Sequence, residues 1–362
     1  MDRFAIEPVL SSVLPEVADF LRTWSRGGVS VLSIERRLRW LLLENPVAGQ
    51  DPTLGYSLRD SEGVLRGLSL QFPVAYAYGD KRILGLCSGS YFVEEPARSL
   101  GFYLFKKFLR TSGYSFYFAS TCNASSSALW KTMGGCAVPN SETEFFLPLK
   151  LDAVMSSFVA GRTSSQVAAG IARVCGYGVN PILRFLNRPV AKFTIQPCHD
   201  WEKLAELSRR HRSPDYITSD RSPAFLEWRY GPGSPAHPCN VYLFQDESGH
   251  EGWFALGDLS RGDAGKFRES VLLDLIWPRE HMSCESIFPE IVRVAADSAD
   301  AITFRWQPGL DYREFSRCVI PHKLPAPRAF VAVPKGSPRF SLQSLDYDDS
   351  DFIAWRFKWT NA

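Results

Sequence analysis

The part of the sequence best suited to chemistry is a strand-like run, residues 84–93, and the turn that follows it. Glu94 and Glu95 come directly after the run, Arg98 follows, and Gly101 opens a segment with apolar residues at helical spacing. A loop that leads into a helix start points backbone N–H groups at one place and adds the positive end of the helix dipole. The segment therefore predicts a phosphate-binding loop, in which Arg98 supplies a cation and Gly101 permits close approach.

A second segment follows about twenty residues later. It has a strand-like run at 114–119 that leads into a segment with Asn123, Trp130 and Gly134. Together the two segments resemble the GNAT superfamily of acyl-CoA-dependent N-acyltransferases. Residues 98–101 read Arg-Ser-Leu-Gly, as in the family's Arg/Gln-x-x-Gly loop for the CoA pyrophosphate, and Asn123 and Gly134 match the family's Asn-x-x-Ala-x-x-Leu-Tyr-x-x-x-Gly segment.

The resemblance implies that acetyl-CoA or another acyl-CoA is the co-substrate. It also places a backbone N–H near Val93 as the donor to the thioester carbonyl. Tyr103 departs from the family, because it stands where Gly or Ala is preferred. The residues that the resemblance assigns to acyl-CoA are Val93, Arg98, Ser99, Leu100, Gly101, Phe102 and Asn123.

Direct acyl transfer to an amine needs a base, a donor to the oxyanion and often an acid. Glu94 and Glu95 are the nearest candidate bases, although a glutamate in such a position is more often a solvated loop residue. Trp130 stands where many family members have the tyrosine that protonates the leaving thiolate, and an indole N–H does not usefully ionise. Tyr117 is the candidate replacement acid. We therefore expect Glu94 and Tyr117 to be the catalytic pair.

The elements that hold these residues belong to an internal repeat in the sequence. Leu38-Arg39-Trp40 and Leu226-Glu227-Trp228 each precede a proline loop, a strand-like run and a Gly-containing turn. The segments 144–150 and 329–335 close the two copies in similar ways. The second copy has no glycine in its loop and carries Glu280 and Glu285 there, and carboxylates disfavour a pyrophosphate.

The repeat and the resemblance predict an α+β protein of two tandem GNAT-like domains, each a mixed, mostly antiparallel sheet flanked by helices. We expect an N-terminal domain with the acyl-CoA loop at 1–150, a helical connector at 151–192 and a C-terminal domain without that loop at 193–362. The sequence leaves open whether the halves form one continuous sheet or separate lobes. The connector's arginines suit an anionic membrane surface or a nucleic acid, but we favour an amphipathic helix packed across the two domains. These arginines are Arg162, Arg173, Arg184 and Arg188.

Composition limits the other classes of function. The 362 residues carry 41 Lys and Arg against 39 Asp and Glu, and this net charge of +2 makes nucleic acid an unlikely partner. The eight cysteines are widely spaced, so we expect reduced thiols, and no Cys or His spacing is typical of a metal site. No signal peptide or membrane-spanning run is visible, which predicts a cytoplasmic protein.

The sequence thus predicts an N-acetyltransferase acting by direct transfer on a small amine. The resemblance extends to bacterial two-domain relatives associated with cell-surface polysaccharides, which makes an amino sugar a candidate acceptor. Two alternatives stay open. One is a non-catalytic ligand-binding or interaction protein with this fold, and the other is a relative that uses aminoacyl-tRNA in place of CoA. The oligomeric state is not predicted.

Overall fold

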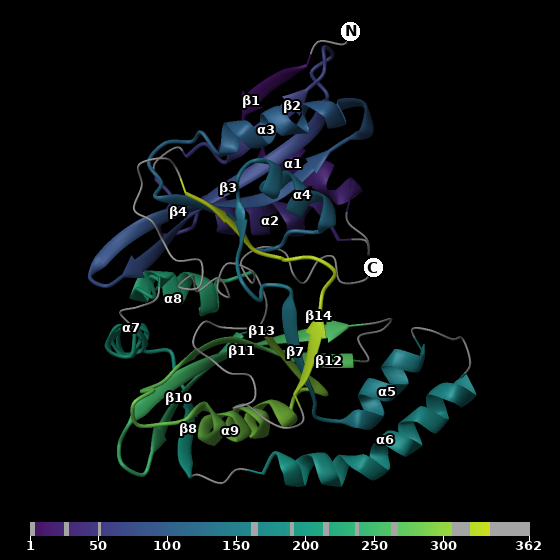
Figure 1. Cartoon of the computed structure of the whole chain (residues 1–362), viewed down its shortest axis with the longest axis vertical. Helices are drawn as coiled ribbons and strands as arrows, with labels where there is room; N and C mark the ends of the chain where they lie inside the picture. Colours follow the sequence, from purple (N-terminus) through teal and green to yellow (C-terminus); the bar gives the residue numbers. More distant parts are fainter. Residues whose placement is uncertain are drawn as a thin grey trace.

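The computed structural model of the chain describes residues 4–24, 29–49, 52–160, 166–188, 192–212, 217–235, 239–261, 267–305 and 319–333. The strands in these residues form two mixed sheets with helices packed against them (Figure 1). This arrangement confirms the predicted α+β fold class, and it shows two separate sheets instead of one continuous sheet.

The described elements of the two halves follow a similar order, although η1, η2 and α4 belong only to the first half and β9 only to the second. The first half contains β1 (Ala5–Pro8), η1 (Ser11–Val13), α1 (Leu14–Thr23), α2 (Val31–Leu42), β2 (Gly55–Arg59), β3 (Leu65–Tyr78), β4 (Lys81–Val93), η2 (Glu95–Leu100), α3 (Gly101–Phe108), β5 (Phe116–Ala119), α4 (Ala124–Thr132), β6 (Cys136–Ala137) and β7 (Thr143–Pro148). The second half contains β8 (Phe193–Pro197), α7 (Trp201–Arg210), β9 (Thr218–Ser219), α8 (Pro223–Tyr230), β10 (Cys239–Asp246), β11 (Glu251–Arg261), β12 (Phe267–Ile276), α9 (Cys284–Ala296), β13 (Ala301–Arg305), β14 (Ile320–Lys323) and β15 (Phe330–Ala332). Between them lie α5 (Leu151–Ala160) and α6 (Gln166–Leu186).

Local sequence explains where several of these helices begin. The side chains of Ser30, Asp200 and Ser283 accept hydrogen bonds from backbone N–H groups in the first turns of α2, α7 and α9. Such caps satisfy donors that have no partner within the helix. In α2, Ile34 and Leu38 lie one turn apart and are buried, so the helix presents an apolar face to the core.

The two sheets exchange their closing strands. The first sheet has the order β1-β2-β3-β4-β5-β15-β6, and the second has the order β14-β7-β13-β12-β11-β10-β8. Strand β7 therefore leaves the first half and pairs with β13 and β14, while β15 returns from the second half and pairs with β5 and β6. The predicted domain limits at 150 and 193 stay a prediction, but neither sheet is made from one continuous stretch of chain.

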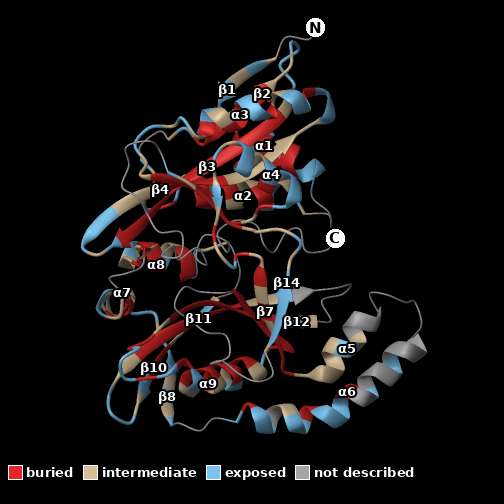
Figure 2. Ribbon diagram, in the orientation of Figure 1, coloured by how far each residue is buried: buried red, intermediate tan, exposed pale blue. Residues whose placement is uncertain are grey.

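Each exchanged strand carries an aromatic ring into the core of the other half. Phe330 of β15 is fully buried, and its ring stacks on Trp130 at 6.4 Å between centroids. Phe145 of β7 stacks on Phe304 at 5.2 Å. The exchange therefore makes each core depend on a segment from the opposite half. Figure 2 shows that buried residues are concentrated along both sheets.

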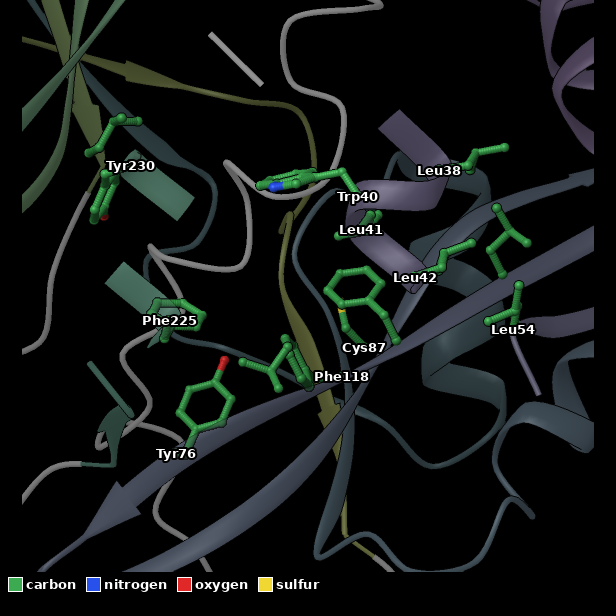
Figure 3. Close-up of a cluster of buried hydrophobic side chains, with 14 of the residues drawn as sticks. Leu38, Trp40, Leu41, Leu42, Leu54, Tyr76, Cys87, Phe118, Phe225 and Tyr230 are labelled. Carbon is green, nitrogen blue, oxygen red and sulfur yellow. The ribbon is translucent and has the colours of Figure 1, made fainter. Parts of the chain in front are cut away.

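A reciprocal tryptophan pair joins α2 to α8, the equivalent helices of the two halves. The rings of Trp40 and Trp228 stack with centroids 4.5 Å apart. The indole N–H of each residue donates to the backbone carbonyl of the other, both at 3.0 Å. Each tryptophan makes the same hydrogen bond to the other. A local twofold relation between the two helices produces such a reciprocal contact. The pair lies beside a continuous apolar core drawn from both halves, and Figure 3 shows the part of it around Trp40 and Phe225.

The second half also contacts the first through β9, which pairs with the end of β3. Just beyond β9, the guanidinium group of Arg221 forms a two-pronged ion pair with Asp274 of β12, at 2.8 and 3.0 Å. The hydroxyl group of Tyr230 and the backbone N–H of Leu275 also donate to this carboxylate. Asp274 is thus a buried carboxylate with its charge balanced and its oxygens bonded.

The tryptophan pair gives the first test. Replacing Trp228 with Phe removes an indole N–H and leaves the carbonyl group of Trp40 without this donor, so we expect the free energy of unfolding to fall by about 1–3 kcal/mol in urea titrations. Trp40→Phe should have a similar effect, and the double variant should lose less than the sum because both residues belong to one interaction. Trp24→Phe, at a ring that is 39% exposed, is the matched control. Additive losses would show that the two indoles act independently.

Candidate functional site

Strand β4 contains a bulge and then separates from its parallel neighbour β5. Ser88 pairs with Gln71 of β3 and Tyr91 pairs with Ser69, so two residues of β4, Gly89 and Ser90, lie opposite a single residue of β3. The parallel pairing of β4 with β5 ends at Cys87, which pairs with Phe118. A bulge turns a strand away from its regular course. The end of β4 therefore carries backbone groups on the side that β5 no longer covers.

The alternation of hydrogen bonds along β4 determines which of its backbone groups face the uncovered side. The backbone N–H of Glu94 donates to the carbonyl group of Arg66 in β3 at 2.8 Å. Bonding to the partner alternates along an antiparallel strand, so the N–H of the preceding residue, Val93, points away from β3. It faces the side on which β4 and β5 have separated. The sequence-based prediction that this N–H can donate to a substrate carbonyl is therefore compatible with the geometry.

The second half repeats this construction in β12. Asp274 pairs with Ala255 of β11 and Leu272 pairs with Leu256, so Leu273 is the extra residue of a bulge. Parallel pairing with β13 ends at Val271, and the following part of β12 carries Asp274. The two copies differ in the group placed there, because the second presents a buried carboxylate paired with Arg221.

In the first half, the start of α3 lies directly against the end of β4. A Cβ atom added to Gly101 would lie 2.5 Å from the hydroxyl oxygen of Tyr91 and 3.2 Å from Cγ2 of Val93. Glycine is therefore required here by packing against the protein itself. Burial raises the pKa of Tyr91 to about 12, so its phenol stays protonated at neutral pH and can donate a hydrogen bond. The sequence analysis did not include Tyr91 among the site residues, because alternating residues of a strand are more often core than catalytic.

The predicted phosphate-binding loop is not an open loop in the structure. Residues Glu95–Leu100 form the 3₁₀ helix η2, which continues into α3. The N–H groups of Ala97 and Gly101 already donate to the carbonyl groups of Glu94 and Arg98. The prediction of several converging N–H groups was therefore wrong for this segment, because its proline and short side chains allow it to close on itself as a helix. Fewer backbone donors are left for a diphosphate, whereas the exposed Arg98 suits one.

The candidate base, Glu94, is held in an ion pair. Its Oε2 atom lies 3.0 Å from Nη1 of Arg66, whose Nε atom lies 2.8 Å from Asp60 in the β2–β3 turn. The hydrogen bond that Arg66 donates to Asp60, and then the one that it donates to Glu94, raise the pKa of Arg66. Glu94 is partly exposed and adjacent to Val93, so the structure does bring the predicted base next to the predicted carbonyl donor.

The candidate acid, Tyr117, lies in the core of the first half. It is 5% exposed, its ring packs edge-on against Phe108, and its hydroxyl group donates to the carbonyl group of Thr111. Burial raises the pKa of this phenol. Trp130 is also a core residue, packed between Phe105 and the exchanged Phe330. The role of Tyr117 as the acid stays a prediction. To protonate a leaving thiolate, its hydroxyl group would have to break the hydrogen bond to the carbonyl group of Thr111.

The remaining predicted residues lie around the ends of α3 and α4. Ser99 and Phe102 are exposed and Leu100 is half-buried. Asn123 caps α4 in a reciprocal arrangement, accepting from the N–H of Ser126 while Ser126 Oγ accepts from the N–H of Asn123. At this position of the family segment, Asn123 therefore has a local structural role, because it caps the helix that follows. Nearby Cys122 is buried, which raises the pKa of its thiol to about 12 and leaves it protonated at neutral pH.

Among the described residues, no group of three or more His, Cys, Asp or Glu side chains is arranged to hold a metal ion. The polar residues at the end of β4 are instead Tyr91, whose hydroxyl group lies against Gly101, and Glu94, which pairs with Arg66; between them lies the backbone of Val93. This arrangement can polarise a carbonyl group through one N–H and can accept a proton on one carboxylate. We define these residues and Gly101 as the β4 site.

No protein-family model and no curated protein matches the sequence, whereas solved structures do match the fold. A protein of Enterococcus faecalis V583 named "Probable N-Acyltransferase" matches with a TM-score of 0.58 and 10% identity, over 92% of this chain and 73% of that one. A GCN5-related N-acetyltransferase from Anabaena variabilis matches at 0.56 and 12%, over 91% and 73%. N-myristoyltransferase of Saccharomyces cerevisiae with bound myristoyl-CoA matches at 0.55 and 11%, over 91% and 82%.

These comparisons show that the chain has the fold of these acyltransferase structures, which is the fold that the two sequence segments predicted. The matches extend over nine-tenths of the chain and therefore include both halves. Likeness at this level of sequence identity defines the fold and leaves the substrates to be argued from the β4 site.

The contact between Gly101 and Tyr91 gives a test of the β4 site. We expect Gly101→Ala to lower the free energy of unfolding by about 1–2 kcal/mol, because the new methyl group meets the Tyr91 hydroxyl. In a Tyr91→Phe background the hydroxyl is absent, so the same change should be neutral or stabilising, as alanine favours a helix. Urea unfolding of the four proteins measures this coupling. Gly170→Ala, at a helical glycine with nothing within 4 Å of the added atom, is the control. An equal loss in both backgrounds would contradict the contact.

Proposed function

We propose that the protein transfers an acyl group from a CoA thioester to a primary amine, and that the β4 site carries out the transfer. The observation that carries the proposal is the end of β4, where the N–H of Val93 faces the side left open by β5 and the carboxylate of Glu94 comes next. The second half repeats the bulge but carries the Arg221–Asp274 ion pair where the first half has Tyr91. The segment after β12 carries Glu280 and Glu285 and has no glycine, and carboxylates disfavour a diphosphate, so we assign CoA to the first half.

The chemistry assigned to these residues is direct transfer. The N–H of Val93 donates to the thioester oxygen and stabilises the negative charge that grows there when the amine nitrogen attacks the carbonyl carbon. Glu94 accepts the proton that the amine loses, after exchanging its bond to Arg66 for one to the substrate. The C–S bond then breaks and CoA leaves as a thiol. Tyr91 is a protonated phenol close to Val93, and Tyr117 is the more distant candidate for protonating the leaving sulfur.

The remaining assignments rest on the resemblance and on the names of the structural neighbours. Arg98 binds the diphosphate, with Ser99, Leu100, Gly101, Phe102 and Asn123 completing that surface. Acetyl is the favoured acyl group, and a small amine or amino sugar in the cytoplasm of a bacterium is the favoured acceptor. A neighbouring structure contains myristoyl-CoA, so longer acyl chains belong in the same test.

Binding of the donor is tested first. Acetyl-CoA, myristoyl-CoA and free CoA are titrated calorimetrically into the intact chain and into Arg98→Ala. We expect Arg98→Ala to weaken binding of all binding-competent forms by about tenfold, because one charge-assisted contact to phosphate is lost. Arg110→Ala, at an exposed arginine just beyond α3, should leave the affinity unchanged. Absence of binding by the intact chain would contradict the proposal and favour an interaction protein with this fold or an aminoacyl-tRNA donor.

Catalysis is tested by the release of free CoA thiol in the presence of a panel of primary amines and amino sugars. We expect Glu94→Gln to reduce the turnover rate by about 10²–10⁴-fold, because an amide cannot accept the amine proton, while the affinity for CoA stays the same. Glu95→Gln is the matched control at the adjacent, exposed carboxylate. Equal rates for Glu94→Gln and the unmodified protein would remove Glu94 from the mechanism.

A further inference from the structure

Helix α6 is oriented with polar and small residues toward the protein. Gly176 lies against the start of α5, where an added Cβ would be 2.4 Å from the backbone nitrogen of Asp152. Asn180 accepts a hydrogen bond from the N–H of Leu151 and donates to Oδ1 of Asp152, both at 2.7 Å. Asn180 and Asn187 are 8% and 7% exposed. The face of α6 that contacts α5 therefore includes amide side chains with satisfied hydrogen bonds.

Several large apolar side chains in the described part of the same helix point to solvent. Val174, Tyr177 and Phe185 are 74%, 72% and 73% exposed, and Ile182 is 57% exposed. Their spacings of three, five and three residues place them within one broad side of a helix. In Figure 2 the described part of α6 is largely pale blue and lies at the edge of the second half, away from the first sheet. The polarity of α6 is thus the reverse of that of a helix that covers a core.

This finding corrects the expectation that the connector packs across the two domains. Helix α5 packs against α6 and contacts β12, and Lys150 at the end of β7 lies 3.4 Å from Asp300 of the second half. The pair is therefore fixed to the second half, and the exposed apolar side of α6 is free of the protein's own core. Contiguous exposed apolar residues of this extent mark interaction surfaces.

The charges of this segment indicate what the surface binds. From residue 153 to residue 199 there is no Asp or Glu, while five residues are cationic. The whole chain has a net charge of only +2, so the rest of it is net negative. The cationic residues of the segment are Arg162, Arg173, Arg184, Arg188 and Lys192.

We propose that α6 docks the protein on an anionic lipid surface, with Val174, Tyr177, Ile182 and Phe185 in the interfacial region of the bilayer. An apolar side combined with exclusively positive charge matches such a surface in both respects. A twofold contact between two copies through α6 would bring like charges together, and a nucleic acid would leave the apolar side chains in water. In the part of the chain that the structure describes, no helix is long and apolar enough to span a bilayer, so docking is on the surface.

The test is co-sedimentation of the full chain with vesicles of phosphatidylcholine, pure or with about 30% phosphatidylglycerol. We expect binding to the anionic vesicles, which about 0.5 M salt weakens because it screens the charges. Tyr177→Ser/Phe185→Ser should reduce the bound fraction at least about tenfold, since two membrane-contacting rings are lost. Leu32→Ser/Val64→Ser is the control, because these side chains are 77% and 43% exposed in the first half.

A charge-reversing pair separates electrostatic from apolar contributions. Arg188→Glu/Lys192→Glu should also weaken binding to anionic vesicles, whereas Arg110→Glu/Lys131→Glu, with the same change in net charge, should not. Thermal unfolding checks that each variant stays folded. The proposal is overturned if the intact chain ignores anionic vesicles or if the serine variant binds equally well. It is also overturned if ultracentrifugation shows that α6 joins two copies of the chain. The same holds if Arg188→Glu/Lys192→Glu abolishes binding to RNA but leaves binding to lipid unchanged. None of these outcomes depends on acyl-CoA binding.

Discussion

The exchange of closing strands is the constraint on which the rest of the molecule depends. Because β7 completes the second sheet and β15 completes the first, neither sheet has its full set of strands without the other half. Phe330 then reaches Trp130 in one core, and Phe145 reaches Phe304 in the other. We expect two halves linked in this way to unfold together. When one half unfolds, the strand that it contributes leaves the other sheet, and the apolar core of the other half is then exposed to water. The Trp40–Trp228 pair adds a direct contact at the centre of this arrangement.

The exchange also positions the β4 site. Strand β15 occupies the side of β5 that faces away from β4, so β5 is held in the sheet by pairing with β15 after its pairing with β4 has ended. The bulge at Gly89 and Ser90 turns β4 at the same level. The separation of the two strands is therefore a consequence of the sheet's construction, and the direction of the Val93 N–H follows from it. The second half repeats the separation, but there it holds the buried Arg221–Asp274 pair.

The acyl-transfer proposal and the lipid-docking proposal concern different halves of the protein. The β4 site depends on residues fixed by the first sheet, whereas α6 is attached to the second half through α5 and Lys150. A transferase docked through α6 would keep its first half, and with it the assigned acyl-CoA surface, on a different part of the molecule from the lipid contact. Lipid docking would then leave the β4 site accessible to a donor from solution.

The sequence by itself determined the fold and the order of its parts, because these depend on local patterns. The loop residues around Gly101, the segment from Asn123 and the repeated Leu-x-Trp landmarks all predicted a duplicated GNAT-like α+β protein. Only the tertiary structure decided which strand joins which sheet, since β7 and β15 have the same local pattern in either pairing. It also showed that Tyr117 is bonded within the core, that Gly101 is required by Tyr91, and that the apolar residues of α6 face outward. These features depend on neighbours far away in the chain, which no spacing within one segment can reveal.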